Sequence, residues 1–149
     1  MKWCKVYKRE PVNAHVKTIV SAATGHFVNI YSVPPDKLLV LEVVSVQIHD
    51  RNPDQQIRAM LEINFRQDDP PGQPDQPKHG DVFAIPLTKT TISDSSGPKT
   101  VFEGTQSLRL YVKDFIMIGS ERDLTDQKSI FYGYISGYLV PHDSPTLRP

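Results

Sequence analysis

The sequence predicts an all-β protein: an antiparallel, jelly-roll-like β-sandwich made by a single domain. Three observations predict this fold. The 13 prolines are spread along the chain, and proline interrupts helix interiors because it lacks a backbone donor and fixes φ. Apolar residues recur with a period of two, which is typical of strands, rather than with the period of a helix. Short polar turns separate the apolar stretches, as in sandwiches and barrels.

The length of 149 residues indicates one domain covering residues 1–149. A chain of this size buries roughly 68–70% of its unfolded surface, so a self-sufficient core is expected. Within the domain we expect a basic N-terminal arm over 1–12, a long polar, proline-rich loop over 66–80 and a C-terminal tail over 141–149.

The stretch 57–65 shows the clearest alternation. Ile57, Ala59, Leu61, Ile63 and Phe65 alternate with mostly polar residues, so one face of this strand should pack on the core and the other should face water.

A longer strand is predicted over 38–49, with apolar residues on both parities in its first half. One face is expected to carry Leu38, Val40, Val44, Val46 and Ile48. The other is expected to carry Leu39, Leu41 and Val43. This first half should therefore be covered on both sides, by a second sheet or by a neighbouring subunit.

The stretch 129–140 should form the last strand, with a row of tyrosines on one side and Gly133 and Gly137 on the other. Glycines inside strands mark bulges or the close approach of another backbone. A polar turn is expected over 93–99. The remaining strands are expected at 14–22, 27–33, 81–88, 99–103, 106–112 and 114–119.

Motifs for the common chemistries are absent. The sequence has no GxSxG elbow, no HxH or HExxH pair and no phosphate-binding glycine loop. The single cysteine, Cys4, excludes an internal disulfide and a zinc finger. We therefore expect a protein that is not an enzyme and that uses no cofactor and no metal.

Six residues are candidates for binding. His49 and Asp50 begin a turn, Asp68 and Asp69 lie in the polar loop, and His79 and Asp81 flank Gly80. Turn formation and solvated loop charge are the alternative explanations for all six.

Charge and hydropathy limit the partners. The 17 basic residues balance 17 acidic ones, which argues against nucleic-acid binding. No apolar run approaches the roughly 18 residues of a membrane span. The basic N-terminus lacks the apolar core of a signal peptide. We expect a cytoplasmic protein, or a component of a bacterial or phage assembly.

Two short stretches carry a resemblance. Arg109-Leu110-Tyr111 and the segment 136–140 (SGYLV) resemble the C-terminal half of small bacterial single-domain β-sandwich proteins of unknown function. The resemblance implies a jelly-roll-like sandwich in a bacterial or phage setting, and it brings no catalytic residues.

Two functions are therefore expected as alternatives. The first is a non-enzymatic structural or interaction module that self-associates through its β-sheet faces; fold analogy favours a trimeric homo-oligomer. The second is a module that binds a carbohydrate or another small ligand with the 66–80 loop. The partner would be a glycan or a protein.

Overall fold

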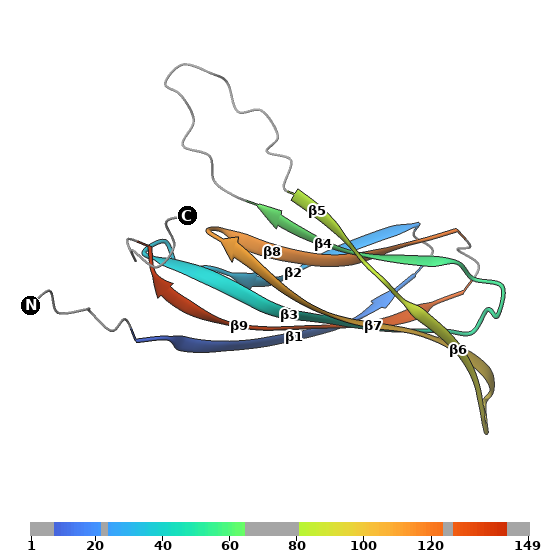
Figure 1. The fold of residues 1–149 in the computed structure, drawn as a ribbon. Helices are drawn as coiled ribbons and strands as arrows, with labels where there is room; N and C mark the ends of the chain where they lie inside the picture. The colour runs from blue at the N-terminus through green and yellow to red at the C-terminus, as the bar shows by residue number, and fades with distance from the viewer. Residues whose placement is uncertain (1–7, 22–23, 65–80, 124–126, 143–149) are drawn as a thin grey trace, which may run out of the picture.

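The computed structural model describes residues 8–21, 24–64, 81–123 and 127–142. Within these ranges all regular secondary structure is β-strand (Figure 1). Nine strands form two antiparallel sheets that pack against each other, which confirms the predicted all-β sandwich. In the described part of the chain no helix could span a membrane.

The two sheets contain five and four strands. In spatial order the five-stranded sheet consists of β1 (Glu10–Val20), β9 (Ser129–Pro141), β3 (Lys37–Asp50), β7 (Gly97–Val112) and β6 (Thr88–Asp94). The four-stranded sheet consists of β2 (Gly25–Ser32), β8 (Phe115–Arg122), β4 (Ile57–Asn64) and β5 (Asp81–Ile85).

The strand pairing is nested. β1 pairs with β9, β2 with β8, β3 with β7 and β4 with β5, and β6 is an additional strand at the edge beside β7. Early strands thus pair with late ones around a central β4–β5 hairpin, as in the two Greek keys of a jelly roll. The pairs β1–β9 and β2–β8 place the first two strands beside the last two, with one pair in each sheet.

The core lies between the inner faces of the sheets. On β4, Ala59, Leu61 and Ile63 are at most 1% exposed, which confirms the alternation predicted for 57–65. They meet buried residues of the opposite sheet such as Phe131 and Ile135. The strand ends at Asn64, and Phe65 falls outside the described residues.

The face assignment predicted for 38–49 was wrong, because β3 is not regular. The register with both neighbouring strands shifts between Leu41 and Val43. This irregularity moves the later residues of β3 to the other parity. The core side is therefore formed by Leu39, Leu41, Val44, Val46 and Ile48.

Double-sided burial of the first half of β3 does occur: the four-stranded sheet covers Leu39 and Leu41 on the inner side, and no other subunit is needed on the outer side. Leu38 and Val40 are 5% and 0% exposed on the outer side of the sheet. Tyr111 of β7 and Tyr138 of β9 lie directly opposite Val40 and pack against this small cluster. Side chains of one chain account for the coverage.

The region 81–112 is organised differently from the prediction. The strand expected at 81–88 ends at Ile85 as β5, β6 was not predicted, and the strands expected at 99–103 and 106–112 are the single strand β7. The polar turn expected over 93–99 is a tight hairpin in which Asp94 pairs with Gly97. Gly97 has a φ of 106°, which glycine adopts without the penalty of a side chain.

Gly137 has the close contact predicted for a glycine within a strand. A β-carbon there would lie 2.2 Å from the Val40 carbonyl oxygen, next to the irregularity of β3. Gly137 thus lets the backbone of β3 approach β9 closely.

Candidate functional site

The structure does not bring the described candidate residues into one site. His49 and Asp50 are neighbours at the end of β3, so their side chains point to opposite faces of the sheet. Asp81 is an exposed residue of the other sheet, paired with Ile63. Asp68, Asp69 and His79 lie outside the described residues.

Asp50 belongs to a buried polar network. Its Oδ2 accepts a hydrogen bond from the Ser129 hydroxyl at 2.7 Å and lies 3.7 Å from Nη1 of Arg122. The same Nη1 donates to Ser129 Oγ at 2.7 Å and to the carbonyl of Gln127 at 2.6 Å. Asp50 Oδ1 accepts from the backbone N–H of Asn52 at 2.8 Å.

This network joins the sheets at one end of the sandwich, because Asp50 and Ser129 belong to one sheet and Arg122 to the other. Asp50, Arg122 and Ser129 are 2%, 6% and 1% exposed. A charge pair so deeply buried and hydrogen-bonded acts as a structural tie, so Asp50 is not assigned to binding.

His49 lies on the outer face of the five-stranded sheet. Its ring centroid lies 5.4 Å from that of Tyr132 on the adjacent strand β9. Its Nε2 is buried and has no hydrogen-bond partner among the described residues. Burial, reinforced by the charge of Lys99, holds the pKa of His49 below its ordinary value. The neutral form of the imidazole is therefore favoured in the folded protein.

The same outer face carries two rows of side chains that cross the strands in register. The first row consists of Lys17, Tyr132, Gln47, Glu103 and Thr88. The second row consists of His15, Tyr134, Ser45 and Thr105. Each row joins an aromatic ring on β9 to polar side chains on β3 and β7.

An open hollow of about 540 Å³ lies where the two rows cross β3, β7 and β6; it is called the polar hollow below. It is lined by Ser45, Val46, Gln47, Thr88, Glu103, Gly104 and Thr105. The hydroxyls of Ser45 and Thr105 are hydrogen-bonded to each other at 2.8 Å. The hollow thus offers hydroxyl, amide and carboxylate groups side by side.

Cations cover most of the tyrosine rings on this face. The Arg9 guanidinium lies 4.6 Å from the Tyr138 ring centroid, and the Lys17 ammonium lies 5.5 Å from that of Tyr132. Arg109 lies 5.9 Å from the Tyr111 ring. Tyr134 is 39% exposed, and among the described residues no cation lies over its ring.

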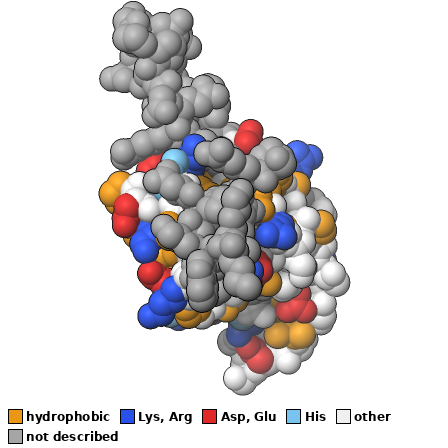
Figure 2. Space-filling model, turned by 60° about the vertical axis from the view of Figure 1, so that its left-hand side comes forward, with side chains coloured by type: hydrophobic (Ala, Val, Ile, Leu, Met, Phe, Trp, Pro, Cys, Tyr) orange, Lys and Arg blue, Asp and Glu red, His pale blue; other side chains and the backbone are white. Residues whose placement is uncertain are grey.

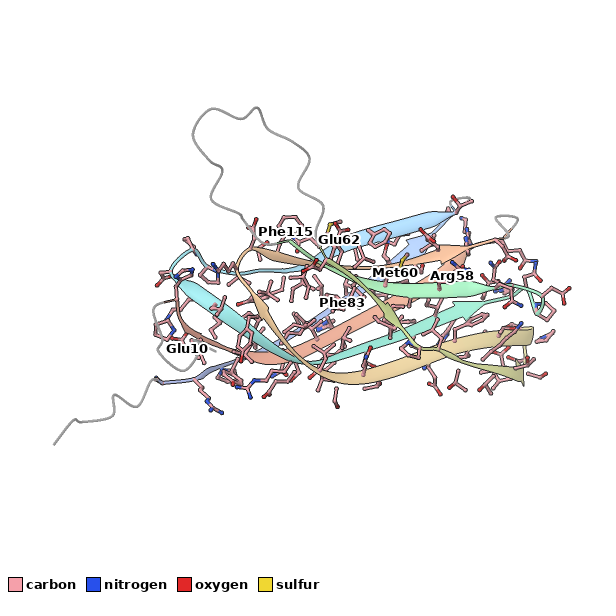
Figure 3. The ribbon with its side chains drawn as sticks, turned by 45° about the horizontal axis from the view of Figure 1, so that its top comes forward. Glu10, Arg58, Met60, Glu62, Phe83 and Phe115 are labelled. Atoms are coloured by element: carbon pink, nitrogen blue, oxygen red, sulfur yellow. The ribbon has the colours of Figure 1, made fainter. Side chains whose placement is uncertain are left out.

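The outer face of the four-stranded sheet is more apolar. One row across its strands consists of Phe27, Gly119, Met60 and Ala84, called the apolar row below. Phe115, Met117 and Val82 lie on the same face in adjacent rows. Arg58, Met60 and Glu62 follow one another along β4 on this face, with Phe115 near the Glu62 end (Figure 3).

Charge is mixed on the surface shown in Figure 2, where Lys and Arg side chains are interspersed with Asp and Glu. Among the described residues, no group of three or more His, Cys, Asp or Glu side chains could hold a metal ion.

By fold the chain is a jelly-roll β-sandwich protein with two chemically different outer faces. No protein-family model matches the chain, and no curated protein matches it. The resemblance to small bacterial β-sandwich proteins stays a prediction.

Sequence reasoning missed Arg122 and Ser129 as partners of Asp50, and it missed the polar hollow. Ser45 and Gln47 shared one parity of the predicted strand 38–49, but Glu103 and Thr105 were not placed in one strand, because 99–103 and 106–112 were expected as separate strands. That these side chains share one face of the sheet follows from the register of β3 with β7, and register cannot be read from the sequence of either strand alone.

Proposed function

We propose that this protein is a non-enzymatic interaction module that self-associates by stacking the outer face of its four-stranded sheet on the same face of a second copy. The observation that carries the proposal is the placement of Arg58 and Glu62 on either side of Met60, in the middle of an apolar surface.

The apolar part of this face is suited to burial. Val82 is 56% exposed, while Phe27, Met60, Phe115 and Met117 are partly exposed. Contiguous exposed apolar side chains with a polar rim are typical of protein interaction sites. Phe83, on the edge strand β5, pairs with the core residue Leu61, so its 36% exposed ring points to the inner side of the sheet and is not part of this face.

The charges favour a second copy as the occupant. A two-fold axis along the apolar row would run perpendicular to β4 and stack Met60 on Met60 of the second copy. Arg58 and Glu62 lie two residues to either side, about 6.7 Å from Met60 along the strand. Arg58 of each copy would then face Glu62 of the other, giving two equivalent ion pairs, with Glu121 beside Arg58 at the rim.

Such an interface is closed and self-complementary. It supports a dimer in place of the trimer expected from fold analogy. The 66–80 loop, to which the alternative ligand-binding function was assigned, lies outside the described residues, and its role stays a prediction.

The test is the absolute mass in solution, measured by light scattering after size-exclusion chromatography at two protein concentrations. We expect a dimer for the natural sequence and a monomer for Met60→Lys, which would place two ammonium groups at the axis. A natural-sequence protein that stays monomeric at the higher concentration, or that forms a trimer, would overturn the stacking.

Charge exchange gives a sharper test. Arg58→Glu and Glu62→Arg should each weaken the dimer, because like charges would then face each other across the axis. The double variant Arg58→Glu/Glu62→Arg should restore the dimer, because position 58 of each copy would again face an opposite charge at position 62 of the other. Arg109→Glu, an exposed charge reversal on the other sheet, is the matched control and should leave the dimer intact.

A further inference from the structure

We propose that the outer face of the five-stranded sheet binds a neutral carbohydrate, with one sugar ring stacked on Tyr134 and its hydroxyls bonded in the polar hollow. This site lies on the opposite side of the sandwich from the proposed self-association face, and it does not depend on that proposal.

Tyr134 is suited to stacking because its ring is both accessible and held in place. The side chain is 39% exposed, and its hydroxyl donates a hydrogen bond to Oδ1 of Asn13 on β1 at 2.9 Å. A ring fixed in this way loses little conformational freedom on binding. Tyrosine supplies a rigid, amphipathic contact surface of the kind that binding sites favour.

The polar hollow begins on the neighbouring strand β3, on the side of Tyr134 away from Asn13. Ser45 lies directly opposite Tyr134 on β3, and Thr105 lies opposite Ser45 on β7. Adjacent strands are about 4.8 Å apart, so the distance from Tyr134 to Thr105 is roughly 10 Å across the sheet. A disaccharide can span this distance while it lies flat on the face.

The lining groups match the chemistry of a sugar. Hydroxyls of Ser45, Thr88 and Thr105 both donate and accept hydrogen bonds, the Gln47 amide does the same, and the Glu103 carboxylate accepts. Sugar hydroxyls are also both donors and acceptors. The volume of about 540 Å³ falls within the range of roughly 300–1,000 Å³ usual for small-molecule sites.

The charges around the hollow favour a neutral ligand over an acidic one. Among the described residues that line it, Glu103 is the one acidic or basic side chain, and its carboxylate would repel a carboxylate or a phosphate. The cations Arg9, Lys17 and Arg109 lie over the rings of other tyrosines of this face. A bound nucleic acid would require protein cations beside Tyr134 to contact its phosphate groups.

The test begins with a panel of neutral and acidic oligosaccharides immobilised on a surface, followed by titration calorimetry of the full-length protein with the best neutral binder in solution. We expect saturable binding of a neutral oligosaccharide. Preference for acidic members, or no binding at up to about 10 mM, would overturn the proposal.

Substitutions then locate the site. Tyr134→Ala should weaken binding at least about tenfold, because the stacking surface is lost, whereas Tyr134→Phe should retain most of it. Gln47→Ala should weaken binding about fivefold through a lost hydrogen bond. Gln56→Ala, an exposed glutamine at the end of the sandwich, is the matched control and should bind like the natural sequence.

Thermal unfolding of each variant establishes that it is folded before binding is measured. As a second readout, amide chemical shifts of Ser45 and Thr105 should move on titration with the sugar, while those of Met60 on the other sheet should not. Undiminished binding by folded Tyr134→Ala, or shifts confined to the other sheet, would contradict the assigned site.

The two proposals can fail separately. Loss of the dimer in Met60→Lys should leave sugar affinity unchanged, and loss of sugar binding in Tyr134→Ala should leave the dimer intact.

Discussion

The carboxylate of Asp50, at the end of β3, lies 3.7 Å from the guanidinium of Arg122, at the end of β8, with both side chains almost completely buried. The Ser129 hydroxyl lies between them, donating to Asp50 and accepting from Arg122. This arrangement ties the five-stranded sheet to the four-stranded one at the end where the 51–56 connection leaves β3.

Removing the negative charge of this pair should destabilise the protein strongly. Asp50→Asn keeps the size of the side chain but removes the negative charge that lies 3.7 Å from the buried guanidinium of Arg122. Breaking a buried pair in this way costs about 3–5 kcal/mol. The free energy of unfolding, measured by urea denaturation, should fall by that amount.

The double variant Asp50→Leu/Arg122→Met is the control for this prediction. It removes both charges, so it should be clearly more stable than Asp50→Asn even though it loses more hydrogen bonds. Equal stability of the two variants would show that the cost does not come from an unpaired charge.

His49 should make stability depend on pH. Burial and Lys99 lower the pKa of its imidazole in the folded protein below the ordinary value of 6.5. Below about pH 6.5 the unfolded chain therefore binds a proton that the folded chain resists, and stability falls until the pH reaches the folded pKa. Above pH 6.5 both states are neutral at this position, and the effect disappears.

The variant His49→Phe preserves an aromatic contact with Tyr132 and removes this titration. The difference in unfolding free energy between it and the natural sequence should change between pH 7.5 and pH 5, in favour of His49→Phe at the lower pH. The exposed His15→Phe on the same face is the control. A difference that is constant over this pH range would refute the assignment.

Gly119 should be intolerant of a side chain. A β-carbon there would lie 2.2 Å from the carbonyl oxygen of His26 and 2.7 Å from ring carbons of Phe27. Because backbone cannot move aside as a flexible side chain can, Gly119→Ala should lower the free energy of unfolding by about 1–3 kcal/mol.

Gly25→Ala is the matched control, since the nearest atom to its β-carbon would be Cγ of Glu121 at 4.0 Å. Denaturant unfolding should place this variant within about 0.5 kcal/mol of the natural sequence. Similar losses in the two glycine variants would mean that the close approach of β2 to β8 is not what makes Gly119 necessary.

Several features were predictable because they are local. The alternation over 57–65 identified β4 and its buried face, since the parity of a regular strand depends only on its own residues. The distribution of prolines disfavoured helices for the same local reason. The close contact at Gly137 was also foreseen from a glycine inside a strand.

Other features depended on the pairing of distant strands. The faces of β3 were assigned wrongly because one irregularity, located by hydrogen bonding to β7 and β9, reverses the parity beyond Leu41. Val40 is covered by Tyr111 and Tyr138, which register places opposite it. The strand β6 was missed because its exposed, polar residues have no apolar face to mark them.

The sequence by itself determined that this protein is all-β with alternating strands, because composition and period are properties of short segments. Only the tertiary structure decided which residues meet: Asp50 with Ser129, 79 residues apart, Tyr134 with Ser45, and Ser45 with Thr105. These meetings are set by the register of whole strands, and register is fixed by burial and hydrogen bonding summed over both sheets.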